Sequence, residues 1–244
     1  MNKGIFDYLS LPKSCYINRK LYKKQFIENF ALNIHERKVL SEYVQSITLK
    51  YLLNKNTINI PPFVDGEIDY CEIAFINVSI ASQEKLKIIS RIIQYIPYPL
   101  FIIFTCKEIS CIGLSKKRIN KQDTAKLIVE EEYFSDWINT SSPSPIEQEF
   151  LEGLHVKHHP FTDLYAFYKS YLDKLLALNA SKYSGSLHVN ETIEASLKEI
   201  QALHVKINEF KNRLKKETNF SDKVALNIKI KMMNNKIEEL KGSL

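Results

Sequence analysis

Four carboxylates that could hold a metal ion lie close together early in the chain. They are Asp65, Glu67, Asp69 and Glu72. A nuclease of the restriction-enzyme kind would need such an acid, followed on the next strand by an acid-x-Lys pair, to hold Mg²⁺ and activate water. Neither the apolar segment Phe101–Thr105 nor the strand after it carries that pair, and the acidic run 130–132 also lacks the lysine. The pattern favours a solvated turn and a wet strand face, with a degenerate metal-dependent nuclease as the alternative.

Other catalytic and metal-binding patterns are also incomplete. His155, His158 and His159 could place two imidazoles on one helical face as metal ligands, but Pro160 follows directly and no Cys or paired acid is near. We interpret this cluster as a surface turn. The six glycines are isolated, so no Gly-rich phosphate loop exists, and neither a Gly-x-Ser-x-Gly elbow nor a nucleophilic Cys setting occurs. The sequence therefore predicts no catalytic residue, no metal site and no cofactor.

Two groups of basic residues are candidate contacts to nucleic acid. The first group is Arg19, Lys20, Lys23 and Lys24; the second is Lys116, Lys117 and Arg118. If the fold brings the groups together, they could bind phosphates without reading base sequence. Two solvated loops are the favoured alternative, because the net charge of +6 is mild and nearby aromatic residues are too few for a stacking platform.

The elements that would position these residues are clearest between Ile68 and Trp137. The expected elements are a strand at Ile68–Ile80, a helix capped by Ser82 and stopped by Pro97, strands at Leu100–Thr105 and Ile109–Leu114, a polar break at Ser115–Asp123 and a strand at Ala125–Phe134. This β-α-β-β-β unit has three short-linked strands after one crossover. We therefore predict an α+β fold with a mixed or antiparallel sheet.

The segments before this unit alternate between helix and strand signals. They predict a short helix or turn at Phe6–Pro12, an edge strand at Ser14–Tyr22, helices at Lys23–Phe30 and Asn33–Val44, a strand at Thr48–Leu53 and an extended piece at Thr57–Pro62. Asn33 and Glu36 have the spacing of a capping box.

The composition changes after Trp137 to a Ser- and Pro-rich run. We predict an α+β domain at 1–138, a linker at 139–145, a helical segment at 146–186 and a helical hairpin or coiled-coil arm at 187–244, with Ser221 capping its second helix. In this arm apolar residues recur at steps of three and four. The arm could close on itself, or it could serve dimerisation or docking.

Length and hydrophobicity fit an ordinary globular protein. The chain has 244 residues, of which 45% are hydrophobic. It contains no apolar run near the ~18 residues that a membrane span requires, and residues 1–4 do not lead into an apolar signal core. We predict a cytoplasmic protein with no membrane partner.

Five short stretches resemble a bacterial family known as the domain of unknown function numbered forty-three ninety-one. They are Tyr8–Pro12, Lys23–Phe26, Asn56–Ile60, Ile96–Leu100 and Ser115–Asn120, and the likeness runs from about Phe6 to Trp137. Many members carry a Trp in the segment corresponding to Ile47–Tyr51, which is absent here. The family has no assigned catalytic residues, so none can be carried over.

The resemblance implies a genomic context, because members are often encoded beside DNA methyltransferases and helicases in clusters that look like restriction or antiphage defence systems. We therefore expect a non-catalytic accessory subunit that docks on a helicase or DNA methyltransferase. A degenerate nuclease and a stand-alone, non-specific DNA-binding protein remain the alternatives. Homo-oligomers through the C-terminal arm also stay open.

Overall fold

The chain folds as two units that divide after Leu175. A computed structural model describes residues 4–242 and 244, with the backbone alone at residues 124 and 125. The first three residues of the predicted 1–138 domain, and Ser243 of the predicted arm, lie outside the described residues. We call the part up to Leu175 the sheet unit and the part from Leu176 onward the hairpin unit.

A mixed sheet forms the centre of the sheet unit. Within the described residues its seven strands are β1 (Tyr16–Leu21), β2 (Val44–Asn54), β5 (Glu72–Ile80), β6 (Leu100–Cys106), β7 (Ile109–Asn120), β8 (Asp123–Phe134) and β9 (Ile138–Asn139). The order is β1-β2-β5-β6-β7-β8, and β9 pairs with the end of β7. Only β5 and β6 run parallel, with helix α5 (Leu86–Ile93) between them in the chain. The predicted fold class and the β-α-β-β-β unit are confirmed.

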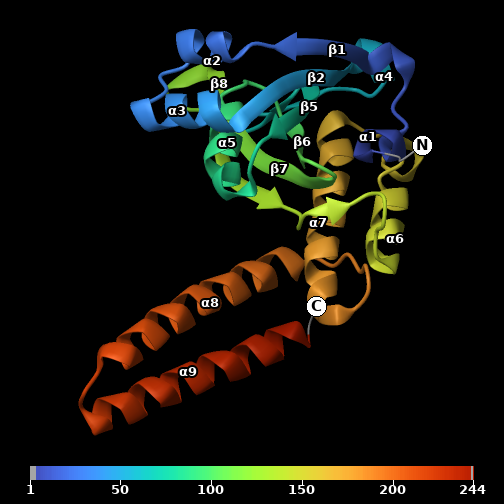
Figure 1. Cartoon of the computed structure of the whole chain (residues 1–244). Helices are drawn as coiled ribbons and strands as arrows, with labels where there is room; N and C mark the ends of the chain where they lie inside the picture. The colour runs from blue at the N-terminus through green and yellow to red at the C-terminus, as the bar shows by residue number, and fades with distance from the viewer. Residues whose placement is uncertain (1–3, 243) are drawn as a thin grey trace. The chain divides into compact units, whose positions relative to one another are not determined.

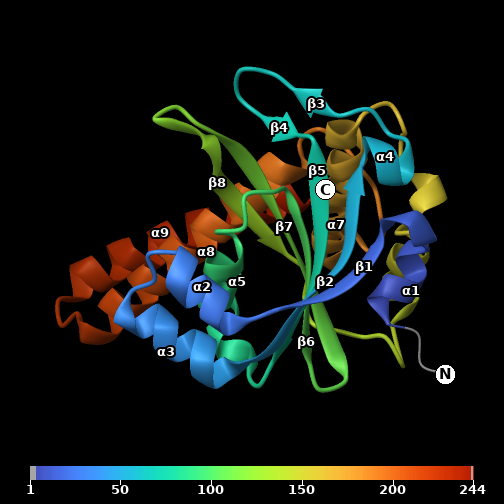
Figure 2. The same ribbon diagram turned by 90° about the horizontal axis from the view of Figure 1, so that it is seen from above.

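Helices cover both faces of this sheet. Helices α2 (Lys23–Asn29), α3 (Ile34–Tyr43) and α5 lie on one face, where Ile76 and Val78 of β5 pack with Ile89 and Ile92 of α5 (Figure 2). On the opposite face Phe101 stacks on Phe75, with ring centroids 4.7 Å apart. Because successive residues of β5 and β6 point to opposite, equally buried faces, these strands are almost wholly apolar.

The remaining elements up to Ser184 pack around the sheet, and the last helix among them crosses the division after Leu175. They are α1 (Ile5–Leu9), α4 (Lys55–Ile58), the two-stranded sheet β3 (Phe63–Val64) with β4 (Asp69–Tyr70), α6 (Pro145–Gly153), α7 (Leu164–Ser184) and three short 3₁₀ turns at Lys13–Cys15, Gln83–Lys85 and Val156–His158. The capping box at α3 forms as predicted: the Asn33 side chain accepts from Glu36 N–H at 2.9 Å, and Asn33 N–H donates to the Glu36 carboxylate at 3.0 Å.

Four of the predicted element boundaries in the sheet unit were wrong. Residues 115–120 are not a break but the second half of β7, because they pair with β8. The predicted extended piece at Thr57–Pro62 is wrong at its start, because residues 57 and 58 belong to α4, where the Asn54 side chain accepts from two N–H groups of the first turn. Strand β2 begins at Val44, which was assigned to the preceding helix. A break at Cys71 divides the predicted strand 68–80 into β4 and β5.

Two long helices dominate the hairpin unit. They are α8 (Ile193–Lys216) and α9 (Phe220–Lys241) (Figure 1). Asn219, not Ser221, caps the second helix by accepting from Ser221 N–H at 2.9 Å. Apolar residues line the seam of α9 that faces α8: Leu226, Ile230, Met233, Ile237 and Leu240. The predicted helical hairpin is confirmed. Within the described residues no helix has the length and apolar character needed to cross a membrane.

Candidate functional site

Three of the four carboxylates of segment 65–72 accept hydrogen bonds, two of them from nearby backbone N–H groups. The Asp65 side chain accepts from Glu67 and Ile68 N–H at 2.7 and 2.8 Å, and these bonds lower the pKa of its carboxyl. Asp69 accepts from Cys71 N–H at 2.9 Å, and Glu72 accepts from the Asn54 amide at 2.9 Å. Across the described residues no group of three or more metal-ligating side chains is close enough to share an ion.

The three histidines have different surroundings. His155 Nδ1 accepts from Lys157 N–H, and His158 is exposed. His159 is buried, not on the predicted surface turn: its ring stacks on Tyr171 with centroids 3.6 Å apart, and its Nδ1 lies 2.6 Å from Ser170 Oγ. Burial lowers the pKa of His159 to about 3, so this imidazole is neutral at physiological pH.

The first basic group lies on the edge strand β1 and on α2. Arg19 and Lys20 are exposed on β1, which makes this sheet edge basic. Lys23 Nζ donates to Ser41 O at 2.9 Å, and Lys24 Nζ lies 3.5 Å from the Glu28 carboxylate. Three strands separate β1 from β7, so the two basic groups are on the order of 19 Å apart. The fold does not join them into one patch.

The three side chains of the second basic group do not all point to the same side of the sheet. Lys116 Nζ lies 5.7 Å from the Tyr133 ring centroid, and Arg118 Nε is 3.0 Å from a Glu130 carboxylate oxygen. Lys117, by contrast, is only 2% exposed. Alternation along β7 therefore turns the middle residue of the group into the protein, where a DNA phosphate cannot reach it.

Buried Lys117 instead caps the C-terminal end of helix α5. Its Nζ donates to Gln94 O at 3.1 Å and to Ile96 O at 2.8 Å. A cation is favourable at this end of a helix, because the last carbonyl groups lack helical partners. Burial lowers the pKa of Lys117 to about 7, although the carboxylate of Glu132 opposes this shift.

Further polar side chains join α5 to strands β7 and β8. Ser115 Oγ donates to Gln94 Oε1 at 3.0 Å, and Ser90 Oγ donates to Glu132 Oε1 at 2.6 Å. From the other face of the sheet, the Tyr168 hydroxyl accepts from Ser115 N–H at 2.9 Å. Because these groups are buried and hydrogen-bonded, they hold the end of α5 in one position relative to the β7–β8 hairpin.

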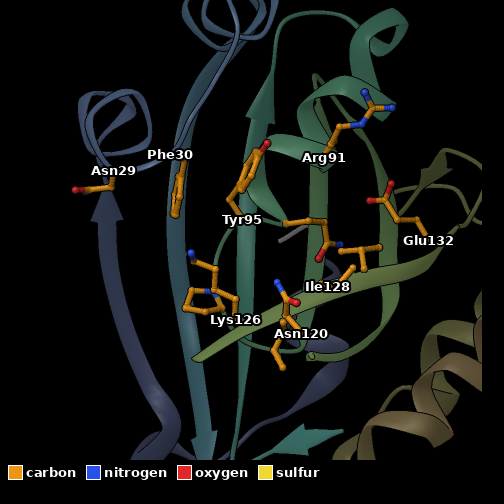
Figure 3. Close-up of a pocket in the computed structure, with 12 residues that line it drawn as sticks. Asn29, Phe30, Arg91, Tyr95, Asn120, Lys126, Ile128 and Glu132 are labelled. Carbon is orange, nitrogen blue, oxygen red and sulfur yellow. The ribbon is translucent and has the colours of Figure 1, made fainter. Parts of the chain in front are cut away.

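Gln94 and Glu132 of this network also line a cavity of about 730 Å³ (Figure 3). Its wall comes from the end of α2, from the end of α5 and from the β7–β8 hairpin. The lining residues are Asn29, Phe30, Arg91, Gln94, Tyr95, Pro97, Asn120, Lys126, Leu127, Ile128, Val129 and Glu132. This volume falls within the range of small-molecule sites in proteins.

The cavity combines aromatic and charged groups. The rings of Phe30 and Tyr95 stack with centroids 5.3 Å apart and an interplanar angle of 17°. Arg91 is exposed and makes no hydrogen bond or ion pair within the described part of the chain. Lys126 forms an exposed pair with Asp123 at 2.7 Å. Sequence reasoning did not single out Phe30, Tyr95 or Arg91 as a site; the one available signal was a polar Gln94-Tyr95 pair directly after an apolar helical stripe.

The comparison with protein families decides membership. Residues 9–237 match the family described as a domain of unknown function (DUF4391). The chain belongs to this family. The match confirms the resemblance carried by the short motifs and extends it over most of the hairpin unit. No curated protein and no solved structure is significantly similar to the chain. The family description names no activity, so a function for this DUF4391 member has to be argued from its geometry.

Proposed function

We propose that the chain is a non-catalytic subunit that binds a protein partner through the α8–α9 hairpin. The genomic context implied by the family resemblance makes a helicase or a DNA methyltransferase of a bacterial restriction-like antiphage defence complex the partner to test. The observation that carries the proposal is a row of exposed apolar side chains on α9. We call it the outer row, and it consists of Phe220, Val224, Ile228 and Met232, which are 80%, 42%, 55% and 66% exposed.

The outer row lies on the side of α9 that faces away from α8. At about 100° per residue, the mean direction of the four side chains is about 180° from that of the seam residues 226–240. A surface helix normally carries polar residues on that side. Helix α9 is thus apolar on two opposite faces, and only one of them is covered by α8. A contiguous exposed apolar face of this kind is typical of protein–protein interfaces.

The charge of the hairpin restricts the partner. Residues 206–231 hold eight Lys or Arg and three Asp or Glu, a net charge of +5 in a chain of net +6. A second copy of the hairpin would bring like charges together, which disfavours self-association. Nucleic acid would complement the charge but would not bury the outer row. We therefore propose that the partner is a different protein, one that presents an apolar groove with an acidic rim.

The experiment is purification of the tagged full-length chain from its own host, with mass spectrometry of the proteins that accompany it. The proposal expects a helicase or methyltransferase in about equimolar amount. The Ile228→Asp variant should lose this protein, because a charge in the centre of the outer row cannot be buried without a partner. Moderate salt should weaken the complex, since its rim is ionic.

A matched control lies on the other unit. Ile34 on α3 is 88% exposed, so Ile34→Asp makes the same chemical change at a residue outside the hairpin and should leave the complex intact. Recovery of the chain alone, recovery as a homodimer, or retention of the partner by Ile228→Asp would each overturn the proposal. Circular dichroism of both variants checks that the hairpin remains helical.

A further inference from the structure

We infer that the cavity beside the β7–β8 hairpin binds a small molecule in which a planar heteroaromatic ring is joined to a phosphate, the chemistry of a nucleoside monophosphate. This inference concerns the sheet unit alone and does not depend on the hairpin or on its partner. Three features of the lining carry it: an aromatic pair, an arginine without a partner among the described residues, and a hydrogen-bonded network that holds the end of α5 in place.

The ring would lie against the aromatic wall. Phe30 and Tyr95 come from segments far apart in sequence and stack nearly parallel, so each ring covers one face of the other and a planar ligand would stack on an outer face of the pair (Figure 3). Aromatic side chains of this kind hold nucleobases by stacking. The Gln94 side chain is 6% exposed, and its amide nitrogen makes no hydrogen bond within the described residues, although its oxygen accepts from Ser115. That nitrogen is a donor available to the edge of a ring.

The phosphate would lie beside Arg91, on the side of the cavity opposite Lys126 (Figure 3). The Arg91 guanidinium has no partner among the described residues, and a guanidinium binds phosphate through two parallel hydrogen bonds. Lys126 lines the other side of the cavity from β8, where it pairs with Asp123, and would not contact a phosphate bound at Arg91. A neutral ring alone would not use the Arg91 guanidinium.

The floor of the cavity needs no reordering before binding. The bonds from Lys117 to Gln94 and Ile96, and from Ser90 to Glu132, fix the end of α5 against the hairpin. A preformed site avoids the entropic cost of ordering its own side chains. The Glu132 carboxylate accepts one hydrogen bond, from Ser90. It can accept another from a sugar hydroxyl.

Isothermal titration calorimetry of the full-length chain tests the inference. The probes are the four common ribonucleoside monophosphates, adenosine and inorganic phosphate, each raised to millimolar concentration. We expect at least one monophosphate to bind about tenfold or more tightly than adenosine and than phosphate. Arg91→Ala should weaken that binding by about tenfold, because the bidentate contact is lost.

A control variant on α5 and a variant that fills the cavity complete the experiment. Lys87 is an exposed cation on α5 that does not line the cavity, so Lys87→Ala should leave the affinity unchanged. The Ile128→Trp variant, which fills the cavity, should abolish binding. The inference fails if no monophosphate binds, if adenosine or phosphate binds equally well, or if Arg91→Ala binds as tightly as the unmodified chain.

Discussion

The two units depart from ordinary surface and core composition in opposite ways. The sheet unit keeps polar side chains inside, with Ser90, Gln94, Ser115 and Lys117 all buried beneath one cavity. The hairpin unit keeps apolar side chains outside, along the outer row of α9. Buried polar groups and exposed apolar groups are the informative exceptions in a folded protein. The two units therefore present different kinds of surface. The sheet unit has a cavity, and the hairpin unit has an exposed apolar helix face.

The largest difference between the units should be the loss in free energy of unfolding when an apolar core side chain is truncated to alanine. Phe101 contacts Phe75 and Tyr171 in a core closed on both sides, so Phe101→Ala should destabilise the sheet unit by about 4 kcal/mol. Ile207 lies in a seam between two helices that can close over the lost volume, so Ile207→Ala should cost about 2 kcal/mol. Urea unfolding measures both.

Two spectroscopic signals separate the units in that experiment. Trp137 is the single tryptophan and belongs to the sheet unit, so its fluorescence follows that unit, whereas circular dichroism also reports α8 and α9. We expect Ile207→Ala to leave the fluorescence midpoint unchanged. An equal shift of both midpoints would show that the units unfold together and would end the comparison.

A smaller effect should appear in the pH dependence of the sheet unit. The pKa of Lys117 is about 7 in the folded chain and 10.5 in the reference state, so between these values the unfolded chain binds more protons than the folded one. The free energy of unfolding therefore rises with pH, by about 2 kcal/mol from about pH 7 to about pH 8.5. Below about pH 7 both states are protonated, and the desolvation penalty is fully present.

Substitution of the buried lysine isolates this contribution. In Lys117→Met the rise should disappear, whereas Lys87→Met, at an exposed position on α5, should keep it. Chemical denaturation at both ends of the pH window gives the two slopes. The window stops below pH 9 because burial raises the pKa of Cys15 and Cys71, and such thiols lower stability as the pH rises further. A rise that persists in Lys117→Met would mean that another group carries it.

The smallest effect on stability should come from the outer row. Ile228 is 55% exposed, so Ile228→Asp should change the free energy of unfolding of the hairpin by no more than about 0.5 kcal/mol. The same variant should lose the partner, which would separate binding from folding. A large loss of helix in Ile228→Asp would instead assign the outer row to the core of the hairpin.

Local patterns in the sequence determined much of the architecture. The alternation in β8, the stripe of α5 and the paired side chains of Asn33 and Glu36 depend on residues within a few positions of one another, so they were readable directly. The heptad of α9 was readable for the same reason. Prediction went wrong at residues 115–120, where a run of charged residues indicated a loop, because the pairing partner that makes it a strand lies in another segment.

Only the tertiary structure decided which charged residues are inside and which segments form the cavity. Lys117 and its neighbours Lys116 and Arg118 are alike in sequence, but the pleat of β7 and the closeness of α5 bury the middle one alone. Phe30, Arg91 and Lys126 line one cavity because the strand order places the β7–β8 hairpin beside the ends of α2 and α5. Such proximity depends on contacts between residues distant in the chain, and a local pattern carries no record of them.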